Sequence, residues 1–481
     1  MITRKLSNLC GIIFLIICSI ILIFMLGASL SVFYVSTENM HVSRILLSGA
    51  LVVELFLLFI GVRVNNISKR AFTGMLILIS LFEYLLWNIY AATNPVSDYK
   101  VLLEGAKSIV NGTFKSLSFD KTNYFYFYNF QIGYTTYLAL VMKVFGEGLV
   151  WFKILDGLYM TLTSIIIYKL VNKISNDKSA AISSLLYAVF IPNVFGASII
   201  NNQHLSTLLL ICAIYFILDH RLSFASYAGI ILGFTQIIRP VAIIAIIASF
   251  LYYFISALEN GSYTSWLKRF ALLIIAFMLV IRGFDFALIK AGVSPGPISK
   301  DNVKYFKFVL GLTGNGVYSI PTENAEKTQV YYDLKTLNFD YNRYNEECLK
   351  AIGKSLKDYK KTLRFIVIKM HNFMGGKDNQ YEFALENAKI TEFINYLLEL
   401  GHLQYITMIV FSIAAIILKL IDRRIKVDII SILIIGFMLV HVFIETQTRY
   451  RYETYVFLSI LSSQFLERFI SYKKYTWSKF N

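Results

Sequence analysis

Long apolar runs alternate with short polar segments along almost the whole chain. Most of these runs contain about 20 residues, and a helix of that length crosses the roughly 30 Å hydrocarbon core of a bilayer. The pattern therefore predicts an all-α polytopic membrane protein, a helical bundle of about twelve transmembrane helices. The expected spans are residues 9–35, 44–63, 71–92, 149–171, 180–200, 204–219, 222–238, 239–258, 268–290, 403–421, 428–445 and 453–471.

Two polar segments are longer than simple connections, and they divide the chain. Residues 93–148 form a first outer loop, and residues 291–402 form a larger external loop region before the last three spans. We expect an N-terminal transmembrane hairpin, a transmembrane module that includes the first outer loop, the external loop region, and the C-terminal transmembrane helices. Their respective ranges are 1–70, 71–290, 291–402 and 403–481.

The first outer loop begins with a predicted amphipathic helix. Pro95 ends the preceding span, and Ser97 can cap a new helix that carries Asp98 in its first turn. Apolar and polar residues then recur on opposite faces at helical spacing up to Gly112, which predicts a helix lying flat on the outer membrane surface. Residues 131–146 are also apolar, but a helix of that length is only about 24 Å long. We therefore expect an interfacial or re-entrant helix there.

The net charge of +16 follows the expected topology. Lysine and arginine flank the spans in alternate loops, so the positive-inside rule places both termini in the cytoplasm and both long segments outside. We therefore expect a multi-pass protein of the cytoplasmic (plasma) membrane whose active site faces outside. The basic residues form no separate soluble patch, which excludes nucleic acid and leaves membrane lipids as partners. The four cysteines have neither disulfide-framework nor metal-site spacing.

Asp98 is the first candidate for chemistry. Its place at the start of an outer helix keeps a carboxylate ionised, as a general base or a metal ligand requires. An acid in the first turn of a helix is also favoured by the helix dipole alone. The structural interpretation of Asp98 therefore stays open beside the functional one.

Arginines on the outer side are the second candidates. Arg239 precedes Pro240 at the outer end of two spans, and Arg449 and Arg451 lie between the last two spans. Positive-inside statistics disfavour arginine on this side, while guanidinium groups fit phosphate oxygens well. The alternative is ordinary contact with lipid headgroups.

Acidic residues inside the spans would support a transporter instead. Glu54, Glu83, Asp156 and Asp285 are such residues, and intramembrane acids are often functional. They do not cluster, and Asp156 lies one turn after Lys153, which predicts a local pair. We therefore give the transporter less weight.

Several outer segments carry a resemblance to a known superfamily. The chain resembles the GT-C superfamily of polyprenyl-phosphate-sugar-dependent membrane glycosyltransferases, near the bacterial protein mannosyltransferase and aminoarabinose transferase branch (glycosyltransferase family 39). The resemblance covers roughly residues 71–470 in order, and the first two spans look like an added hairpin. The matching motifs are Ser97-Asp98-Tyr99…Gly112, Gln131-Ile132-Gly133-Tyr134, Phe145-Gly146, Ile238-Arg239-Pro240, Gly311-Leu312…Gly316-Val317-Tyr318 and Gln447-Thr448-Arg449-Tyr450-Arg451.

The resemblance implies an inverting glycosyl transfer on the outer membrane face. A polyprenyl-phosphate-linked sugar is the implied donor, and the acceptor is a cell-envelope glycan, lipid or protein. Asp98 is then the base for the acceptor hydroxyl. The implied phosphate ligands are Arg449, Arg451 and Arg239, and the candidate substrate contacts are Tyr99, Gln203, His204, Tyr450 and Glu445.

One segment departs from the family pattern. Many relatives carry a second acid where this chain has Asn201-Asn202-Gln203-His204. A two-acid site for a divalent metal such as Mg²⁺ or Mn²⁺ is therefore left open, and either the arginines alone or another acid such as Glu445 would have to serve. A polysaccharide polymerase or ligase, and a lipid-linked sugar flippase, remain the alternative functions.

Overall fold

The computed structural model describes residues 2–37, 67–91, 93–313, 334–385, 392–422 and 427–480. These residues form helices joined by turns and loops, with no strand among them. The expected span 44–63, Glu54 and the Gly-rich motif from Gly314 onward lie outside the described residues. The helices are α1 (Ile2–Thr37), α3 (Lys69–Ala91), α4 (Ser97–Val110), α5 (Lys115–Ser118), α6 (Tyr124–Phe127), η2 (Asn129–Gln131), α7 (Ile132–Phe145), α8 (Leu149–Ile174), α9 (Asp177–Ala188), α10 (Ile191–Gly196), α11 (Gln203–Ile217), α12 (Leu222–Ile238), α13 (Ala242–Asn260), α14 (Tyr263–Lys290), α15 (Phe306–Thr313), α17 (Tyr341–Lys357), α18 (Tyr359–Gly375), α19 (Gln380–Ala384), α20 (Glu392–Ile421), α21 (Ile429–Phe443), η4 (Thr448–Arg451) and α22 (Tyr452–Phe480).

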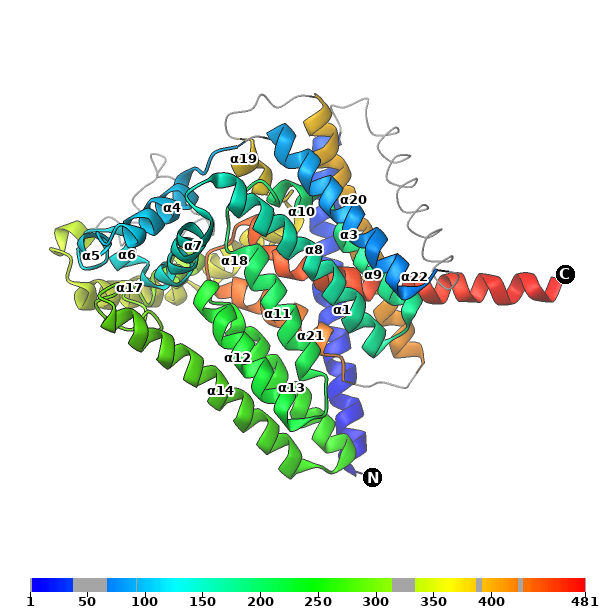
Figure 1. Cartoon of the computed structure of the whole chain (residues 1–481). Coiled ribbons are helices and arrows are strands. Elements are labelled where there is room, and N and C mark those ends of the chain that lie inside the picture. Colours follow the sequence, from blue (N-terminus) through cyan, green and yellow to red (C-terminus); the bar gives the residue numbers. More distant parts are fainter. Residues whose placement is uncertain are drawn as a thin grey trace.

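Apolar helices of membrane-crossing length confirm the predicted fold class. Six of the described helices are long and apolar enough to cross a bilayer, namely α1, α3, α8, α13, α14 and α20. Three shorter apolar helices, α11, α12 and α21, pack among them. Neighbouring helices α11 to α14 run side by side, and α4 to α7 lie together with α17 at one end of this bundle (Figure 1).

The expected span 180–200 is not one helix. Helix α9 ends at Ala188, and the short α10 begins at Ile191 with Pro192 in its first turn. Proline has no backbone N–H to donate to the preceding turn, so the chain breaks there although its hydropathy is continuous. A turn after α10 leads into the buried Asn201, which precedes α11.

The polar region 291–402 contains more regular structure than its hydropathy indicates. Helix α18 contributes Met370, Phe373 and Met374 to the main hydrophobic core and packs against α1. Helix α20 begins at Glu392, eleven residues before the predicted span (403 − 392). Its buried Glu399 forms an ion pair with Lys377 of the preceding segment. A hydropathy scale penalises Glu399 as if it were unpaired, and this explains the late predicted start.

The first outer loop folds largely as predicted, with one local difference. Helix α4 occupies Ser97–Val110 and buries Leu102 and Ala106 against α7. The expected cap at Ser97 is wrong, because Val96 is the N-cap residue and no side chain caps the helix. Ser97 instead has a φ of 50°, in the left-handed region that non-glycine residues rarely occupy.

Close helix packing explains one glycine of the family-like motifs. A Cβ at Gly133 of α7 would collide with the carbonyl oxygen of Ile237 in α12. Glycine therefore lets the outer-loop helices approach the bundle where Arg239 follows α12. A side chain at Gly133 would push these two elements apart.

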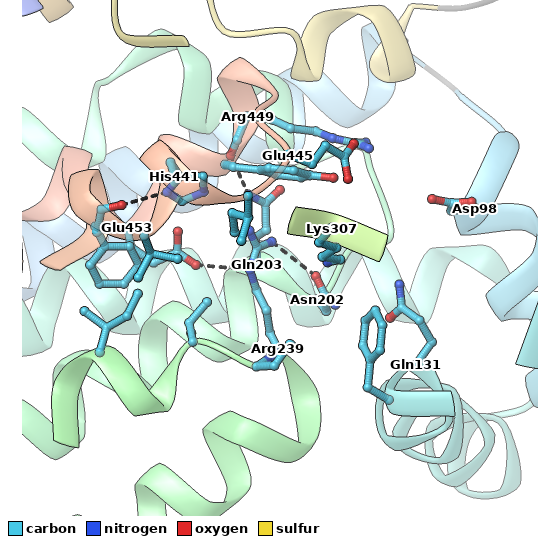
Figure 2. A pocket seen from close by; sticks show the side chains of 18 of the residues that line it. Asp98, Gln131, Asn202, Gln203, Arg239, Lys307, His441, Glu445, Arg449 and Glu453 are labelled. Atoms are coloured by element: carbon cyan, nitrogen blue, oxygen red, sulfur yellow. Dashed lines mark hydrogen bonds and ion pairs between the residues drawn. The ribbon is translucent and has the colours of Figure 1, made fainter. Parts of the chain in front are cut away.

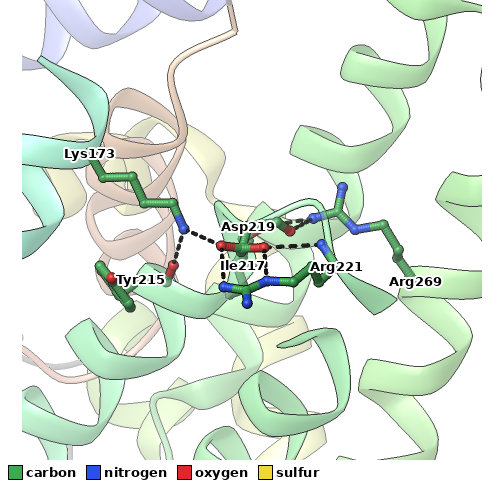
Figure 3. A network of polar contacts seen from close by, with 6 residues as sticks. All are labelled: Lys173, Tyr215, Ile217, Asp219, Arg221 and Arg269. Atoms are coloured by element: carbon green, nitrogen blue, oxygen red, sulfur yellow. Dashed lines mark hydrogen bonds and ion pairs between the residues drawn. The ribbon is translucent and has the colours of Figure 1, made fainter. Parts of the chain in front are cut away.

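A polar network joins the ends of four helices around Asp219 (Figure 3). The Asp219 carboxylate accepts hydrogen bonds from Arg221 Nε at 3.0 Å and from Lys173 Nζ at 3.0 Å, and the Arg221 hydrogen bond holds the pKa of Asp219 well below its usual range. Arg269 donates to the carbonyl oxygens of Ile217, at 3.0 Å, and Asp219. The network fixes the ends of α8, α11, α12 and α14, because each contributes or adjoins one of these residues.

Candidate functional site

Segments from the whole chain converge on one cavity of about 160 Å³. Its walls come from α4, the start of α11, the α12–α13 junction, α15, the end of α21, and η4 with the start of α22 (Figure 2). One wall is apolar and includes Val241, Ile244, Phe437 and Val440. The polar lining residues are Asp98, Tyr99, Gln131, Asn202, Gln203, Arg239, Lys307, His441, Glu445, Arg449, Tyr450 and Glu453.

The cavity brings together most of the residues predicted from sequence. Asp98 lies on one side of the cavity, and Arg239 and Glu453 lie on the other side (Figure 2). The predicted residues that line the cavity are Asp98, Tyr99, Gln203, Arg239, Glu445, Arg449 and Tyr450. His204 and Arg451 do not line it.

His204 is buried behind the cavity. Its Nδ1 lies 3.4 Å from Asp156 Oδ1, and its ring packs against Tyr452. The expected pair between Lys153 and Asp156 is absent among the described ion pairs, and Lys153 instead donates to the carbonyl oxygen of Thr93 at 2.8 Å. Asp156 therefore has a structural partner, which removes one support for the transporter.

Arg451 is a buried structural residue. Its guanidinium donates to the carbonyl oxygens of Met374 at 2.5 Å, Gly376 at 2.6 Å and Thr448 at 3.2 Å. The side chain is 1% exposed and its charge lies 4.5 Å from the ring centroid of Tyr405. Its N–H groups therefore donate to backbone carbonyl oxygens, and Arg451 holds the η4 turn in place rather than facing the cavity.

Arg449 projects from the same turn into the cavity. Its Nη1 donates to the Tyr99 hydroxyl at 2.5 Å, and the guanidinium lies 4.2 Å from the ring centroid of Phe383. The backbone of Arg449 is held on both sides, since its N–H donates to Asn379 Oδ1 at 3.0 Å and its carbonyl accepts from Gln203 Nε2 at 2.6 Å. Its buried Nε has no hydrogen-bond partner within the described part of the chain, and so can bind an anion.

Arg239 occupies the break between α12 and α13. The following Pro240 has no N–H, so α12 ends at Ile238 and Arg239 takes an extended conformation with φ −153° and ψ 130°. Its Nε lies 3.3 Å from Glu453 Oε1, and its Nη1 donates to Asn202 Oδ1 at 3.4 Å. Glu453 is fully buried at the start of α22, and both members of this pair line the cavity.

Asp98 enters the cavity from the first turn of α4. The side chain faces the cavity although the residue as a whole is exposed, and the partial loss of solvent on that side raises the pKa of its carboxyl above the ordinary value of 3.8. The charges of Arg449 and Lys307 and a hydrogen bond with Tyr124 act in the opposite direction. A raised pKa makes the carboxylate a stronger base than a fully solvated aspartate, which favours proton abstraction.

Lys307 is the main residue of the cavity that the sequence did not indicate. It lies on α15 with its Nζ 4.9 Å from the ring centroid of Phe130, and burial lowers the pKa of its ammonium. Its backbone carbonyl accepts from Glu445 N at 3.1 Å, which ties α15 to the segment before η4. The only sequence signal was indirect, because Lys307 lies four residues before Gly311 of a family-like motif.

Glu453 was also missed. It lies two residues beyond Arg451, at the end of a motif that was recognised. A buried acid next to a predicted phosphate-binding arginine was a detectable signal. Gln131 and Asn202 also line the cavity and stand in segments that the sequence analysis quoted without giving them a role, whereas His441 carried no signal.

The residues of the cavity do not form a site suited to a divalent metal. Among the described residues, no group of three His, Cys, Asp or Glu side chains lies close enough to hold an ion. Amides, Asn202 and Gln203, stand where many relatives of the resembled family carry an acid. Two of the acids that line the cavity are already engaged, Glu453 by Arg239 and Glu445 by Gln447 Nε2 at 2.9 Å.

A comparison with family models matches the middle of the chain. Residues 133–282 match the dolichyl-phosphate-mannose-protein mannosyltransferase family. This segment runs from the outer-loop helix α7 to α14 and includes Asn202, Gln203 and Arg239. The match supports the resemblance to the GT-C superfamily of polyprenyl-phosphate-dependent glycosyltransferases.

Solved structures show distant similarity to the chain. ArnT from Cupriavidus metallidurans bound to undecaprenyl phosphate is 12% identical, with a TM-score of 0.38 over 82% of this chain and 78% of that one. Archaeal oligosaccharyltransferase AglB from Archaeoglobus fulgidus, in complex with an inhibitory peptide and a dolichol-phosphate, is 13% identical, with a TM-score of 0.34. That alignment covers 82% of this chain and 56% of AglB. None of the curated proteins compared with the chain matches its sequence.

Proposed function

We propose that the protein is an inverting glycosyltransferase that uses a polyprenyl-phosphate-linked sugar on the outer face of the cytoplasmic membrane. The observation that carries the proposal is the placement of one outer-loop acid, Asp98, opposite cations from three distant segments, Arg239, Lys307 and Arg449, in a single cavity. The family match over residues 133–282 supports the same class. The acceptor is a hydroxyl of an envelope glycan, lipid or protein.

The cations bind the phosphate of the donor. Arg449 offers a buried N–H that no described residue accepts, and Arg239 and Lys307 supply further positive charge. Fixed donors aimed at the leaving phosphate stabilise the charge that develops as its bond to the sugar breaks. The apolar wall formed by Val241, Ile244, Phe437 and Val440 accommodates the first part of the lipid chain.

Asp98 completes the reaction as the base. The acceptor hydroxyl oxygen attacks the anomeric carbon, and the bond from that carbon to the phosphate oxygen breaks. The electron pair of the broken bond stays on polyprenyl phosphate, and the hydroxyl proton moves to Asp98. Attack from the side opposite the phosphate inverts the anomeric configuration. Tyr99, Gln203, Tyr450 and Glu445 line the space in which the sugar would lie.

Replacing Arg449 tests the phosphate assignment. We expect Arg449→Ala to weaken binding of undecaprenyl phosphate by at least roughly 30-fold, since removing one partner of a buried charged hydrogen bond costs about 2–5 kcal/mol. Binding of radiolabelled lipid to purified protein in detergent measures this. Arg282→Ala is the matched control, because Arg282 is exposed on α14 and does not line the cavity. Unchanged affinity in folded Arg449→Ala protein would contradict the assignment.

Arg451→Ala is expected to behave differently. Removing this side chain deletes the hydrogen bonds that it donates to the carbonyl oxygens of Met374, Gly376 and Thr448. We therefore expect a lower melting temperature in detergent, with donor affinity reduced only as far as the η4 turn is displaced. A large loss of donor affinity at an unchanged melting temperature would instead indicate that Arg451 binds the phosphate.

The pH dependence of transfer tests the role of Asp98. Only the ionised carboxylate accepts a proton, so activity should fall as the pH drops through the pKa of Asp98. Because the partial loss of solvent raises that pKa, the loss should begin at a higher pH than an ordinary aspartate would give. Removing a neighbouring positive charge disfavours the ionised carboxylate, so Lys307→Met should raise the pKa of Asp98 further and move the loss of activity to still higher pH. If Lys307→Met leaves the fall in activity at the same pH, the group that titrates there is not Asp98.

A further inference from the structure

Helices α17 and α18 form a corner that carries an unusual combination of side chains. Helix α18 buries one face, with Thr362, Met370 and Phe373 turned towards the protein. Its other face is exposed and combines apolar with basic side chains. The exposed apolar residues of the corner are Leu356 (52%), Tyr359 (66%), Leu363 (59%), Val367 (49%) and Ile368 (53%).

These residues form a stripe at helical spacing. Tyr359, Leu363 and Val367 follow one another at intervals of four, so they lie on one line along α18. No described element covers this line, because each of the three side chains remains about half exposed or more. An apolar stripe of this kind on a helix that is short for a crossing is typical of an element seated at the membrane interface.

Basic side chains flank the stripe. Lys360 and Arg364 run beside it on α18, and Lys354 and Lys357 end α17. All four are exposed, and none takes part in an ion pair among the described residues. The one acid of the turn, Asp358, is engaged, since its side chain accepts from Lys361 N at 3.2 Å at the start of α18.

We infer that the α17–α18 corner is a docking surface for anionic phospholipid headgroups. The apolar stripe enters the acyl boundary while the four cations contact headgroup phosphates, as in amphipathic membrane-surface helices. A soluble polyanion would engage the cations but would leave the exposed stripe in water, so a lipid surface is the partner that satisfies both. This surface is separate from the cavity, and the inference does not depend on the proposed transfer.

The corner is also connected to the cavity wall. Ser355 of α17 donates to the carbonyl oxygen of Leu312 at 2.8 Å, and Tyr344 and Cys348 pack with Phe306 in one apolar cluster. Leu312 and Phe306 belong to α15, the helix that carries Lys307. Seating the corner on lipid therefore restrains the element that supplies one of the cations.

Hydrogen exchange of the full-length protein in lipid nanodiscs tests the inference. Exchange of the amides between Lys354 and Ile368 is measured by mass spectrometry in discs of phosphatidylcholine alone and in discs that also contain phosphatidylglycerol. We expect slower exchange in the anionic discs, with each cation contributing about fivefold in affinity for the anionic surface. The combined variant Lys354→Gln, Lys357→Gln, Lys360→Gln and Arg364→Gln should lose the difference between the two lipids.

The control variant removes exposed cations from other connecting segments. It carries Lys115→Gln, Lys121→Gln, Lys300→Gln and Lys304→Gln, and should keep the full response to phosphatidylglycerol. Leu363→Ser with Val367→Ser should speed exchange in both discs, because it removes the apolar contact. Equal exchange of the wild type in both discs would overturn the inference. Equal protection by soluble polyphosphate in neutral discs would overturn the lipid assignment.

Discussion

Asp98→Asn should lower the rate of sugar transfer by about 10²- to 10⁴-fold while leaving donor binding unchanged. The amide fills the same space but cannot take the proton of the acceptor hydroxyl. The first experiment is transfer of radiolabelled sugar from a panel of undecaprenyl-phosphate sugars to envelope material, with wild-type and variant protein purified in detergent. Binding of undecaprenyl phosphate to both proteins is measured in parallel.

Glu104→Gln is the matched control for this change. Glu104 lies on the same helix but does not line the cavity, and it forms an exposed ion pair with Lys100 at 3.9 Å. It should leave both transfer and binding unchanged. Equal transfer by wild type and Asp98→Asn would remove Asp98 from the chemistry and leave Glu445 as the remaining acid on that side of the cavity. No transfer by folded wild type with any donor would instead count against the proposed enzyme class.

Breaking the Arg239–Glu453 pair should have the largest effect on stability. Arg239→Leu leaves the carboxylate of Glu453, which is fully buried, without its charge partner. Removing one member of a buried ion pair costs about 3–5 kcal/mol, whereas replacing both members with apolar residues is often close to neutral. The double variant Arg239→Leu with Glu453→Leu should therefore recover most of the melting temperature lost by Arg239→Leu.

The double variant also separates stability from ligand binding. Its donor affinity should stay low, because it still lacks the Arg239 guanidinium. Melting in detergent and radiolabelled lipid binding, measured on wild type, both single variants and the double variant, form a complete cycle. Strict additivity of the two single losses in stability would show that the charges do not interact. If the double variant binds the donor as tightly as the wild type does, Arg239 does not bind the phosphate.

The sequence predicted those cavity residues whose own neighbourhood in the chain is unusual, and missed those that only the fold brings to the cavity. Asp98 drew attention as an acid at the start of an outer helix, and Arg449 as an arginine on the side where positive-inside statistics disfavour it. Lys307 had no such signal, because only the folding of α15 beside the α21–η4 segment brings it near them. Arg451 shares its motif with Arg449, and the sequence could not tell which of the two faces backbone carbonyls.

Hydropathy predicted the class of fold better than the helix boundaries. Glu399 lowers the hydropathy averaged over a window, although Lys377 pairs with it in the structure. The predicted start of α20 was therefore too late. The same average ran through Pro192, where backbone geometry rather than polarity ends a helix. Both errors arise where a single pairing or a single missing N–H outweighs the mean character of the segment.

The two sides of the cavity rest on different hydrophobic clusters. Asp98 stands on α4, which packs with α7 in its own apolar cluster, whereas Tyr452 and its neighbours after η4 belong to the main core. Substitutions that reshape the α4–α7 unit therefore act on Arg449 only through its hydrogen bond with Tyr99, and its backbone contacts with Asn379 and Gln203 stay in place. For the proposed transferase, we expect changes in the outer-loop helices to alter the choice of acceptor during divergence, while recognition of the lipid carrier stays the same.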